Sequence, residues 1–290
     1  MLPTVLAVLL VIAAVAAAVT TRVRSSIALS GAVADRLALD AEADGIVRLV
    51  GLWLALEARG RVPPSGLPLD GRPLRCRLEP GLGVTLAVQD QGGLLDLNAS
   101  PRPLLEEVLR RTGIGDVEAM SVAAQIVDFR DPDDVPEPNG GAESRRYGED
   151  GLGYRPRNAP FATPDELDQL PAMTPALYAA IRPAVTIWNG HPGFDPRRMD
   201  WRLAPRLGAE TLGSLAAMPP SDGVRFEVTV AMEAVRGAGV VRAGLVILDD
   251  PTRPAGAVRA WRRPAQPPPA GGLSDHPACR PLQDLFAAGR

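Results

Sequence analysis

The chain has 290 residues, a formal net charge of −3 and a hydrophobic content of 46%. This composition is ample for one large domain or two modest ones, and it excludes a low-complexity chain. The cysteines Cys76 and Cys279 are too few for a disulfide scaffold or a four-ligand zinc site, and the sequence leaves open whether they pair.

Charge is distributed unevenly along the chain. Residues 96–195 carry 17 acidic residues and 9 arginines, a net charge of −8, whereas the remainder carries 17 and 22, a net charge of +5. Nucleic-acid binding needs basic side chains facing phosphate, so the acidic stretch argues against it. HExxH, GxSxG, P-loop and GxGxxG patterns are absent, and we therefore expect no catalytic residues and no enzyme activity.

The chain begins with an apolar run. Residues 2–19 carry no charge, and as a helix they span roughly 27 Å, enough for the core of a bilayer. We expect residues 1–22 to be the transmembrane half of one long helix and residues 23–60 its amphipathic half, ended by Gly60 and Pro63. A cleaved signal peptide is the alternative, but the basic segment that precedes one is absent. The membrane-anchor residues are Leu2, Val5, Leu9, Ile12, Val15 and Val19.

Alternating apolar residues predict strands in residues 61–97. The clearest are residues 74–78 and 84–88, followed by a turn at 90–93 and a third short strand at 94–97. We expect an antiparallel meander packed on the long helix.

Residues 98–188 have a helical pattern instead. We expect Ser100 to cap a helix that begins at Pro101, and Asp116 to cap the next one. The Thr163-Pro164-Asp165-Glu166 capping box and Thr174-Pro175 begin two more. The last two resemble a helix-hairpin-helix, which makes DNA binding a competing hypothesis that the net charge disfavours.

Strands return in residues 189–262, with clear alternation at 226–232, an apolar run at 240–248 and a last strand at 257–261. A short helix is expected at 209–218. Residues 263–290 predict a Pro-rich linker and a poorly ordered tail, in which residues 282–286 either form one helical turn or dock elsewhere on the protein. The fold class is α+β: a long N-terminal helix on an antiparallel sheet, with a helical domain inserted between strands.

A long acidic loop interrupts the helical part. Residues 126–166 leave a helical pattern at Phe129 and pass through many prolines and glycines, which argues against regular helix or a central strand. Long loops inside compact domains are usually functional or disordered. Closely spaced carboxylates repel unless a cation joins them, and calcium takes 6–8 oxygen ligands on a flexible frame. The candidate ligands are Asp131, Asp133, Asp134, Glu143, Asp150 and Asn158. A solvated acidic loop without an ion is the alternative.

Several motifs then occur in order, and the chain resembles minor pseudopilin K of the type II secretion system. The resemblance is strong over residues 94–188 and extends by pattern to 2–60 and 223–262. The motifs are DLNA at 96–99, AQIVDFRDPD at 124–133, GAE at 141–143, Tyr147, RNAPF at 157–161, DEL at 165–167, Met173-Thr174, Leu177-Tyr178 and Val185-Thr186.

The resemblance implies a pilin-like fold and a place at the tip of the pseudopilus, where the protein initiates or caps the filament that drives export across the outer membrane. It implies the inner membrane as the anchor site, the periplasm for the rest of the chain, and minor pseudopilins I and J as partners, with secreted cargo or the outer-membrane channel as further candidates. It also implies one or two calcium ions in the inserted domain. Asp131, Asp133 and Glu143 fall on the family motif, whereas the other candidate ligands come from chemistry alone.

Other assignments stay open. A minor pilin-like protein of a DNA-uptake or type IV pilus system, and a membrane-anchored calcium-binding interaction protein, are the alternatives. A leader ending in glycine precedes the apolar run in the family, whereas this sequence starts at Met1-Leu2, so we expect either a start farther upstream or different processing. Val5 occupies the position at which major pilins carry glutamate, and the family's tip member also lacks that glutamate.

Overall fold

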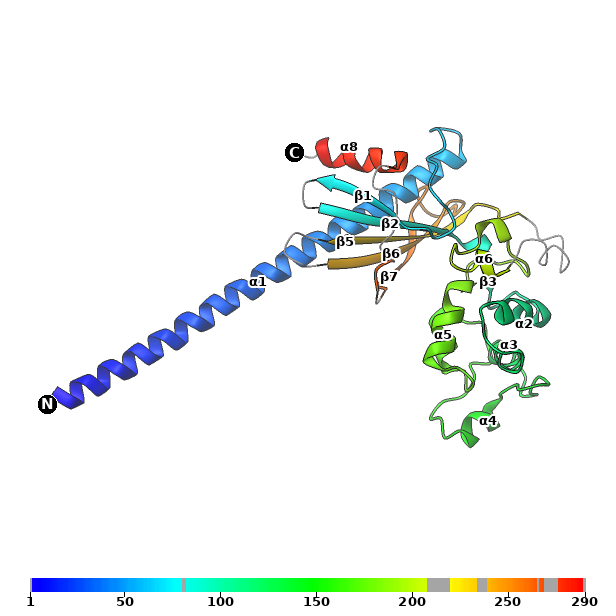
Figure 1. Ribbon diagram of the computed structural model, residues 1–290, viewed down its shortest axis with the longest axis horizontal. Helices are drawn as coiled ribbons and strands as arrows, with labels where there is room; N and C mark the ends of the chain where they lie inside the picture. The colour runs from blue at the N-terminus through cyan, green and yellow to red at the C-terminus, as the bar shows by residue number, and fades with distance from the viewer. Residues whose placement is uncertain are drawn as a thin grey trace.

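The computed structural model describes residues 2–79, 82–207, 220–233, 239–264, 266–268 and 276–288. Figure 1 shows a long helix, a sheet packed against its C-terminal part, and a separate lobe at the end of the molecule opposite the N-terminus. We call residues 94–207 of this lobe the helical domain. The short helix expected at 209–218 lies outside the described residues.

Helix α1 (Leu2–Ala58) is continuous, which confirms the prediction of one long helix. Its side chains up to residue 38 are exposed wherever they are described, and Leu39 is the first buried one. From there Ala43, Ile46, Val47 and Val50 enter the core under the sheet. Gly60, with φ 63°, follows the end of the helix, where a left-handed residue commonly stops one.

The first part of α1 has the length and composition of a membrane anchor. In the part of the chain that the structure describes, one helical segment, Ile12–Ala58, contains a window apolar enough to cross a bilayer. The predicted anchor side chains of Val5, Leu9, Ile12, Val15 and Val19 are all exposed. The side chain of Leu2 lies outside the described set.

A five-stranded antiparallel sheet covers the C-terminal half of α1 in the order β1-β2-β5-β6-β7. Its strands are β1 (Leu74–Glu79), β2 (Leu82–Asp90), β5 (Arg225–Glu233), β6 (Gly239–Ile247) and β7 (Val258–Arg262). Strands β2 and β5 are direct neighbours in the sheet, yet the helical domain separates them in sequence. The predicted insertion of a helical domain between strands is therefore confirmed.

The predicted third strand is present, but its predicted place in the meander is wrong. Strand β3 (Leu95–Asp96) does not join β2 but pairs in parallel with β4 (Val185–Thr186) in a separate two-stranded sheet. The 3₁₀ turn η1 (Gln91–Gly93) redirects the chain. A Cβ atom on Gly93 would lie 2.0 Å from the carbonyl oxygen of Arg198, so only glycine allows the chain to pass so close to residues 195–198.

The helical domain has its own apolar core, separate from that of the sheet. Its elements are α2 (Arg102–Arg111), α3 (Asp116–Arg130), α4 (Ser144–Glu149), η2 (Pro164–Gln169), α5 (Pro175–Ile181), η3 (Arg182–Ala184), η4 (Pro196–Arg198) and α6 (Ala204–Leu207). Helix α4 lies inside the acidic loop, so the prediction that residues 126–166 hold no regular helix beyond Phe129 was too strict. The predicted capping box at Thr163 and Glu166 is present, although it begins a 3₁₀ helix.

The C-terminal tail is also more ordered than predicted. Residues 277–288 form the turn η5 (Pro277–Cys279) and helix α8 (Arg280–Ala288) beside β1. A disulfide joins Cys279 to Cys76 and settles the pairing that the sequence left open. Cys279, Ala278 and Leu282 are buried in the core of the sheet, which explains why the tail packs rather than remaining loose.

Candidate metal centre

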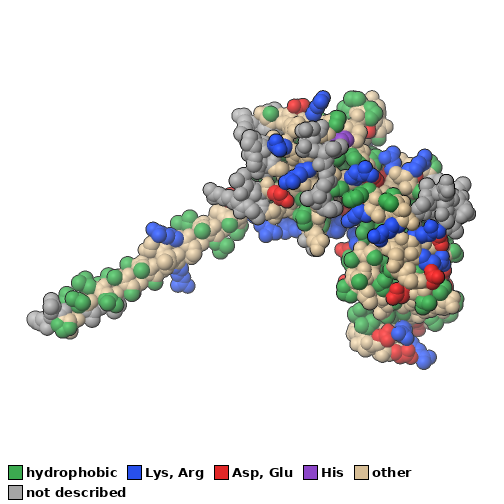
Figure 2. All heavy atoms as spheres, viewed as in Figure 1, with side chains coloured by type: hydrophobic (Ala, Val, Ile, Leu, Met, Phe, Trp, Pro, Cys, Tyr) green, Lys and Arg blue, Asp and Glu red, His purple; other side chains and the backbone are tan. Residues whose placement is uncertain are grey.

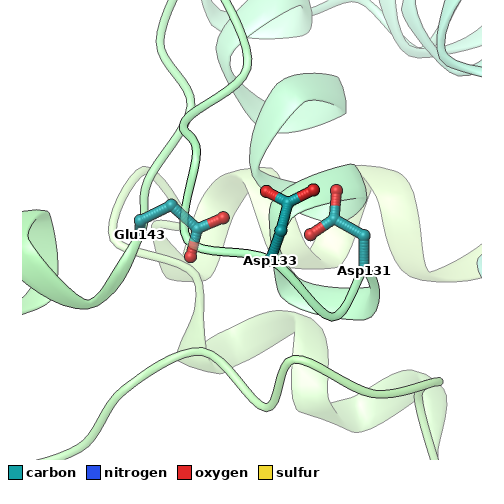
Figure 3. A group of neighbouring side chains, drawn as sticks. All are labelled: Asp131, Asp133 and Glu143. Atoms are coloured by element: carbon teal, nitrogen blue, oxygen red, sulfur yellow. The ribbon is translucent and has the colours of Figure 1, made fainter.

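Three carboxylates of the acidic loop lie together. One oxygen each from Asp131, Asp133 and Glu143 falls within a group whose members are within 4.8 Å of one another. Asp131 and Asp133 follow the C-terminus of α3, and Glu143 immediately precedes α4. Figure 3 shows Glu143 reaching toward the two aspartates from the facing segment. Two stretches of chain ten residues apart thus direct negative charge into one space.

Several oxygens at this place are buried and accept no hydrogen bond from any described residue. They are Oδ1 of Asp131, both carboxylate oxygens of Glu143, and Oδ1 of Asn158. Buried acceptors without a partner cost free energy, and in native proteins nearly all of them are satisfied. A cation bound between these oxygens would satisfy them.

Among the described residues no arginine forms an ion pair with these three carboxylates, although the charge of Arg130 partly offsets the repulsion at Asp131. Arg145 pairs with Glu149 at 2.8 Å and Arg146 with the C-cap residue Asp150 at 2.9 Å, so the arginines of α4 bind acids within or next to their own helix. The carboxylates therefore repel one another. The pKa of Glu143 is raised from 4.5 to about 8, first by burial and then by the carboxylates around it. The pKa of Asp131 is raised as well, by burial and then by Asp133.

Asp128 holds the loop in place from the last turn of α3. Its fully buried carboxylate accepts hydrogen bonds from the backbone N–H of Glu137 at 2.9 Å and of Ala142 at 2.6 Å. Gly141 lies against it so closely that a Cβ atom would be 2.4 Å from Oδ2 of Asp128. Burial raises the pKa of Asp128 to about 6 despite these two hydrogen bonds. Asp128 thus holds both ends of residues 137–142, and this segment leads directly to Glu143.

Further contacts attach the loop to α2 and α3. Arg102 donates to Glu137 at 2.5 Å and to the carbonyl oxygen of Pro138 at 2.6 Å. Gln125 donates to the carbonyl oxygen of Gly140 at 3.0 Å. These contacts explain how a stretch rich in proline and glycine is held in one conformation without regular structure.

Asn158 approaches the site from the returning segment of the loop, which follows α4. Its amide Nδ2 donates to the carbonyl oxygen of Asp133 at 2.7 Å, and this leaves Oδ1 as the unpartnered acceptor described above. Its φ of 48° is left-handed, a conformation that asparagine tolerates better than most residues. Two residues later begins Pro160-Phe161, where Phe161 stacks on Phe129 at 4.5 Å and fixes this segment against α3.

Two predicted ligands are placed differently. Asp150 ends α4 and pairs with Arg146, outside the carboxylate group, so the geometry does not support it as a ligand. Asp134 is near enough to raise the pKa of Glu143, but its Oδ1 faces the backbone N–H of Ser144 at 3.4 Å. Asp131, Asp133, Glu143 and Asn158 are the predicted residues that the structure brings together.

This donor set fits a hard cation. It consists only of carboxylate and amide oxygens, the ligands that calcium prefers, and it includes four oxygens that have no other described partner. The sequence analysis did not identify the anchoring role of Asp128 or of Gln125. Their position one and two turns before the acidic run, on the face of α3 toward the loop, is the signal that could have identified them.

The comparisons with known proteins agree with this architecture. Residues 85–190, which include every residue of the site, match the family model described as Type II secretion system (T2SS), protein K. A comparison with curated protein sequences found no match. A chain in the crystal structure of the GspK-GspI-GspJ complex from the enterotoxigenic Escherichia coli type 2 secretion system aligns with a TM-score of 0.60 and 16% identity, covering 84% of this chain and 100% of that one.

The two comparisons bear on different parts of the chain. The structural match covers 84% of this chain, and at 16% identity it establishes the fold. The family match is confined to the inserted helical domain and the strand that leads into it. Residues 85–190 therefore resemble protein K of the type II secretion system, and the chain has a fold similar to that of a chain in the GspK-GspI-GspJ complex.

Proposed function

We propose that this chain is a minor pseudopilin of the protein K type in a type II secretion system, and that it stands at the tip of the pseudopilus, where it initiates or caps the filament. The observation that carries this proposal is the position of the helical domain. It lies beyond the C-terminal part of α1, at the end of the molecule opposite the N-terminal anchor (Figure 1). A subunit added above would meet this bulk, whereas subunits below would meet the exposed part of α1. The role is structural, not catalytic.

Minor pseudopilins of the I and J types are the proposed partners. The similar structure from Escherichia coli is a complex of GspK with GspI and GspJ. In this chain, α1 is exposed from residue 3 to residue 38 wherever its side chains are described, including Val23, Ile27, Val33 and Leu37. An apolar helical surface of this length requires either lipid or neighbouring helices to cover it.

The proposed location is the inner membrane, with the sheet and the helical domain in the periplasm. Two features support it. The apolar window of α1 is suited to a bilayer. The Cys76–Cys279 disulfide needs an oxidising compartment, and the bacterial periplasm is one.

Calcium is the proposed ligand of the carboxylate group. Asp131, Asp133, Glu143 and Asn158 would hold it, with Asp134 as a further candidate. When bound, the ion would supply positive charge that offsets the carboxylates and would accept their oxygens as ligands. This would fix the loop that connects α3 to α4 and thereby the outer surface of the helical domain.

The first test is co-purification of the full chain with the I- and J-type pseudopilins of the same organism, with calcium and with a chelator. The tip proposal expects a stable complex, and the calcium proposal expects Glu143→Gln to abolish its response to calcium. Glu149→Gln is the matched control, because Glu149 lies on the same segment but pairs with Arg145. A complex that forms equally under all conditions would contradict only the calcium part. Absence of any complex would contradict the assignment of partners.

A further inference from the structure

Strand β1 is one edge of the five-stranded sheet. Among the described strands it pairs with β2 alone, in a register that is regular from Leu74 to Arg77 and shifts before Glu79. An edge strand presents a row of backbone N–H and C=O groups on which another strand can form, and proteins protect such edges. The other edge, β7, has two protective features: its register with β6 shifts between Leu245 and Val246, and Pro264 follows two residues after its end.

Helix α8 lies against the β1 edge (Figure 1). The side-chain amide of Gln283 donates to the carbonyl oxygen of Arg77 at 2.9 Å and so occupies an acceptor that an added strand would use. Below it, Ala278 and Leu282 are buried in the core of the sheet, at 2% and 1% exposure. The helix therefore covers the edge strand through both a polar contact and an apolar one.

The attachment of this helix is covalent. Cys279, just before α8, is bonded to Cys76 in the middle of β1, across 203 residues of sequence. Both cysteines are 1% exposed. A nine-residue helix is only marginally stable by itself in water, so it needs such an attachment to remain on the edge.

We propose that η5 and α8, tied to β1 by the disulfide, form an intramolecular guard that prevents β1 from pairing with a second copy of this chain. The guard directs assembly to other surfaces of the subunit. Without it, β1 strands from two copies would pair and extend the two sheets into one across a twofold axis.

The test uses the full chain in detergent and the variant Cys76→Ser/Cys279→Ser, which cannot form intermolecular disulfides. Light scattering over a range of concentrations, at about 0.3 M salt to screen repulsion between arginines of β1, measures the association. We expect the average mass per complex to double relative to the parent protein. The same variant carrying Arg77→Pro should return to the mass of the parent.

Arg77→Pro is a selective control. In an antiparallel strand the N–H and C=O of one residue point to the same side, and the carbonyl of Arg77 points to α8. Proline there removes an outward donor without breaking a hydrogen bond to β2. A double-serine variant that stays at the parent mass with a native circular dichroism spectrum overturns the proposal, as does a mass increase that Arg77→Pro leaves unchanged.

If the double-serine variant does not fold, Gln283→Pro provides the second measurement. It breaks α8 and removes the contact to Arg77 while the disulfide is retained. An increase in mass with Gln283→Pro supports the guard, and an unchanged mass overturns it.

Discussion

Asp44 and Arg242 form a two-pronged ion pair that joins α1 to the sheet. Arg242 on β6 donates from Nε to Oδ1 of Asp44 at 2.5 Å and from Nη2 to Oδ2 at 2.9 Å. The guanidinium also lies over the ring of Trp261 at 5.1 Å. The pair is located where α1 begins to contact the sheet, five residues after Leu39. It therefore lies between the exposed rod of α1 and the globular part.

Replacing Asp44 by alanine should destabilise this junction. The loss leaves Arg242 partly buried without its carboxylate. We expect the free energy of unfolding to fall by about 2 kcal/mol, less than the roughly 3–5 kcal/mol for a fully buried pair, because both side chains are partly exposed. Urea unfolding of the full chain in detergent measures it. The control is Arg75→Ala, which breaks the exposed pair with Glu233 and should cost at most about 1 kcal/mol. Equal losses in the two variants would contradict the importance of the junction.

Asp128→Asn should loosen the acidic loop. One carboxylate oxygen becomes an NH₂ group facing a backbone N–H, so a buried hydrogen bond is lost and two donors oppose each other. We expect a loss of about 1–3 kcal/mol in stability. Hydrogen exchange at Glu137 and Ala142 should become faster, while exchange in α2 stays as in the parent protein. Unchanged exchange at these two amides would show that the loop is held by other contacts.

The fold could be predicted where local patterns are long. The helical period located α2, α3 and α5, and the alternation of apolar residues located β1, β2 and β5. Of the caps predicted for these three helices only Thr174 of α5 is confirmed, because Pro101 and Gly115 precede the first residues of α2 and α3. Strand β3 could not be placed, because two residues carry no periodic signal and its partner β4 is about ninety residues away. The Cys76–Cys279 pair could not be predicted either, because the two cysteines are 203 residues apart in the sequence.

The site shows a different limit. Asp131, Asp133 and Glu143 carry the same side-chain chemistry as Asp150, and composition alone could not separate them. The i,i+4 spacing of Arg146 on α4 and Asp150 at its C-cap separates Asp150 from the ligands, because the arginine neutralises that carboxylate locally. That spacing is visible in the sequence only once α4 is recognised as a helix.

Glu143→Gln should have opposite effects on stability with and without calcium. In the presence of a chelator, the substitution removes a buried carboxylate that its neighbours repel, so the melting temperature should rise by a few degrees at pH 8. In calcium, the parent protein gains stability by binding the ion, and the variant should gain little. Thermal melts of both proteins, each with calcium and with chelator, measure the four values. The control Glu149→Gln should respond to calcium as the parent does. If calcium leaves the melting temperature of the parent protein unchanged, the proposed metal centre is contradicted.

The stability of the calcium-free protein should fall as pH rises. The pKa of Glu143 is raised from 4.5 to about 8 and that of Asp128 from 3.8 to about 6. A carboxyl group whose pKa is higher in the folded state contributes stability that is fully present below the unfolded value and is lost as pH passes the folded value. The loss should therefore begin near pH 4 and be complete above about pH 8. Glu143→Gln should remove the contribution of Glu143 between about pH 4.5 and 8, so that the slope above pH 6 disappears and the part due to Asp128, between about pH 4 and 6, remains.

Calcium should reverse this slope. The ion binds the ionised carboxylates, so protons compete with it and the apparent affinity should increase from pH 6 to pH 8. Titration calorimetry at these two pH values, in buffers of different ionisation enthalpy, measures both the affinity and the protons released. The expected release at pH 6 is close to one proton, from Glu143, and it should diminish toward pH 8. An affinity that is independent of pH over this range would contradict this prediction: either Glu143 is already ionised without calcium, or the ion is held by Asp131 and Asp133 without it.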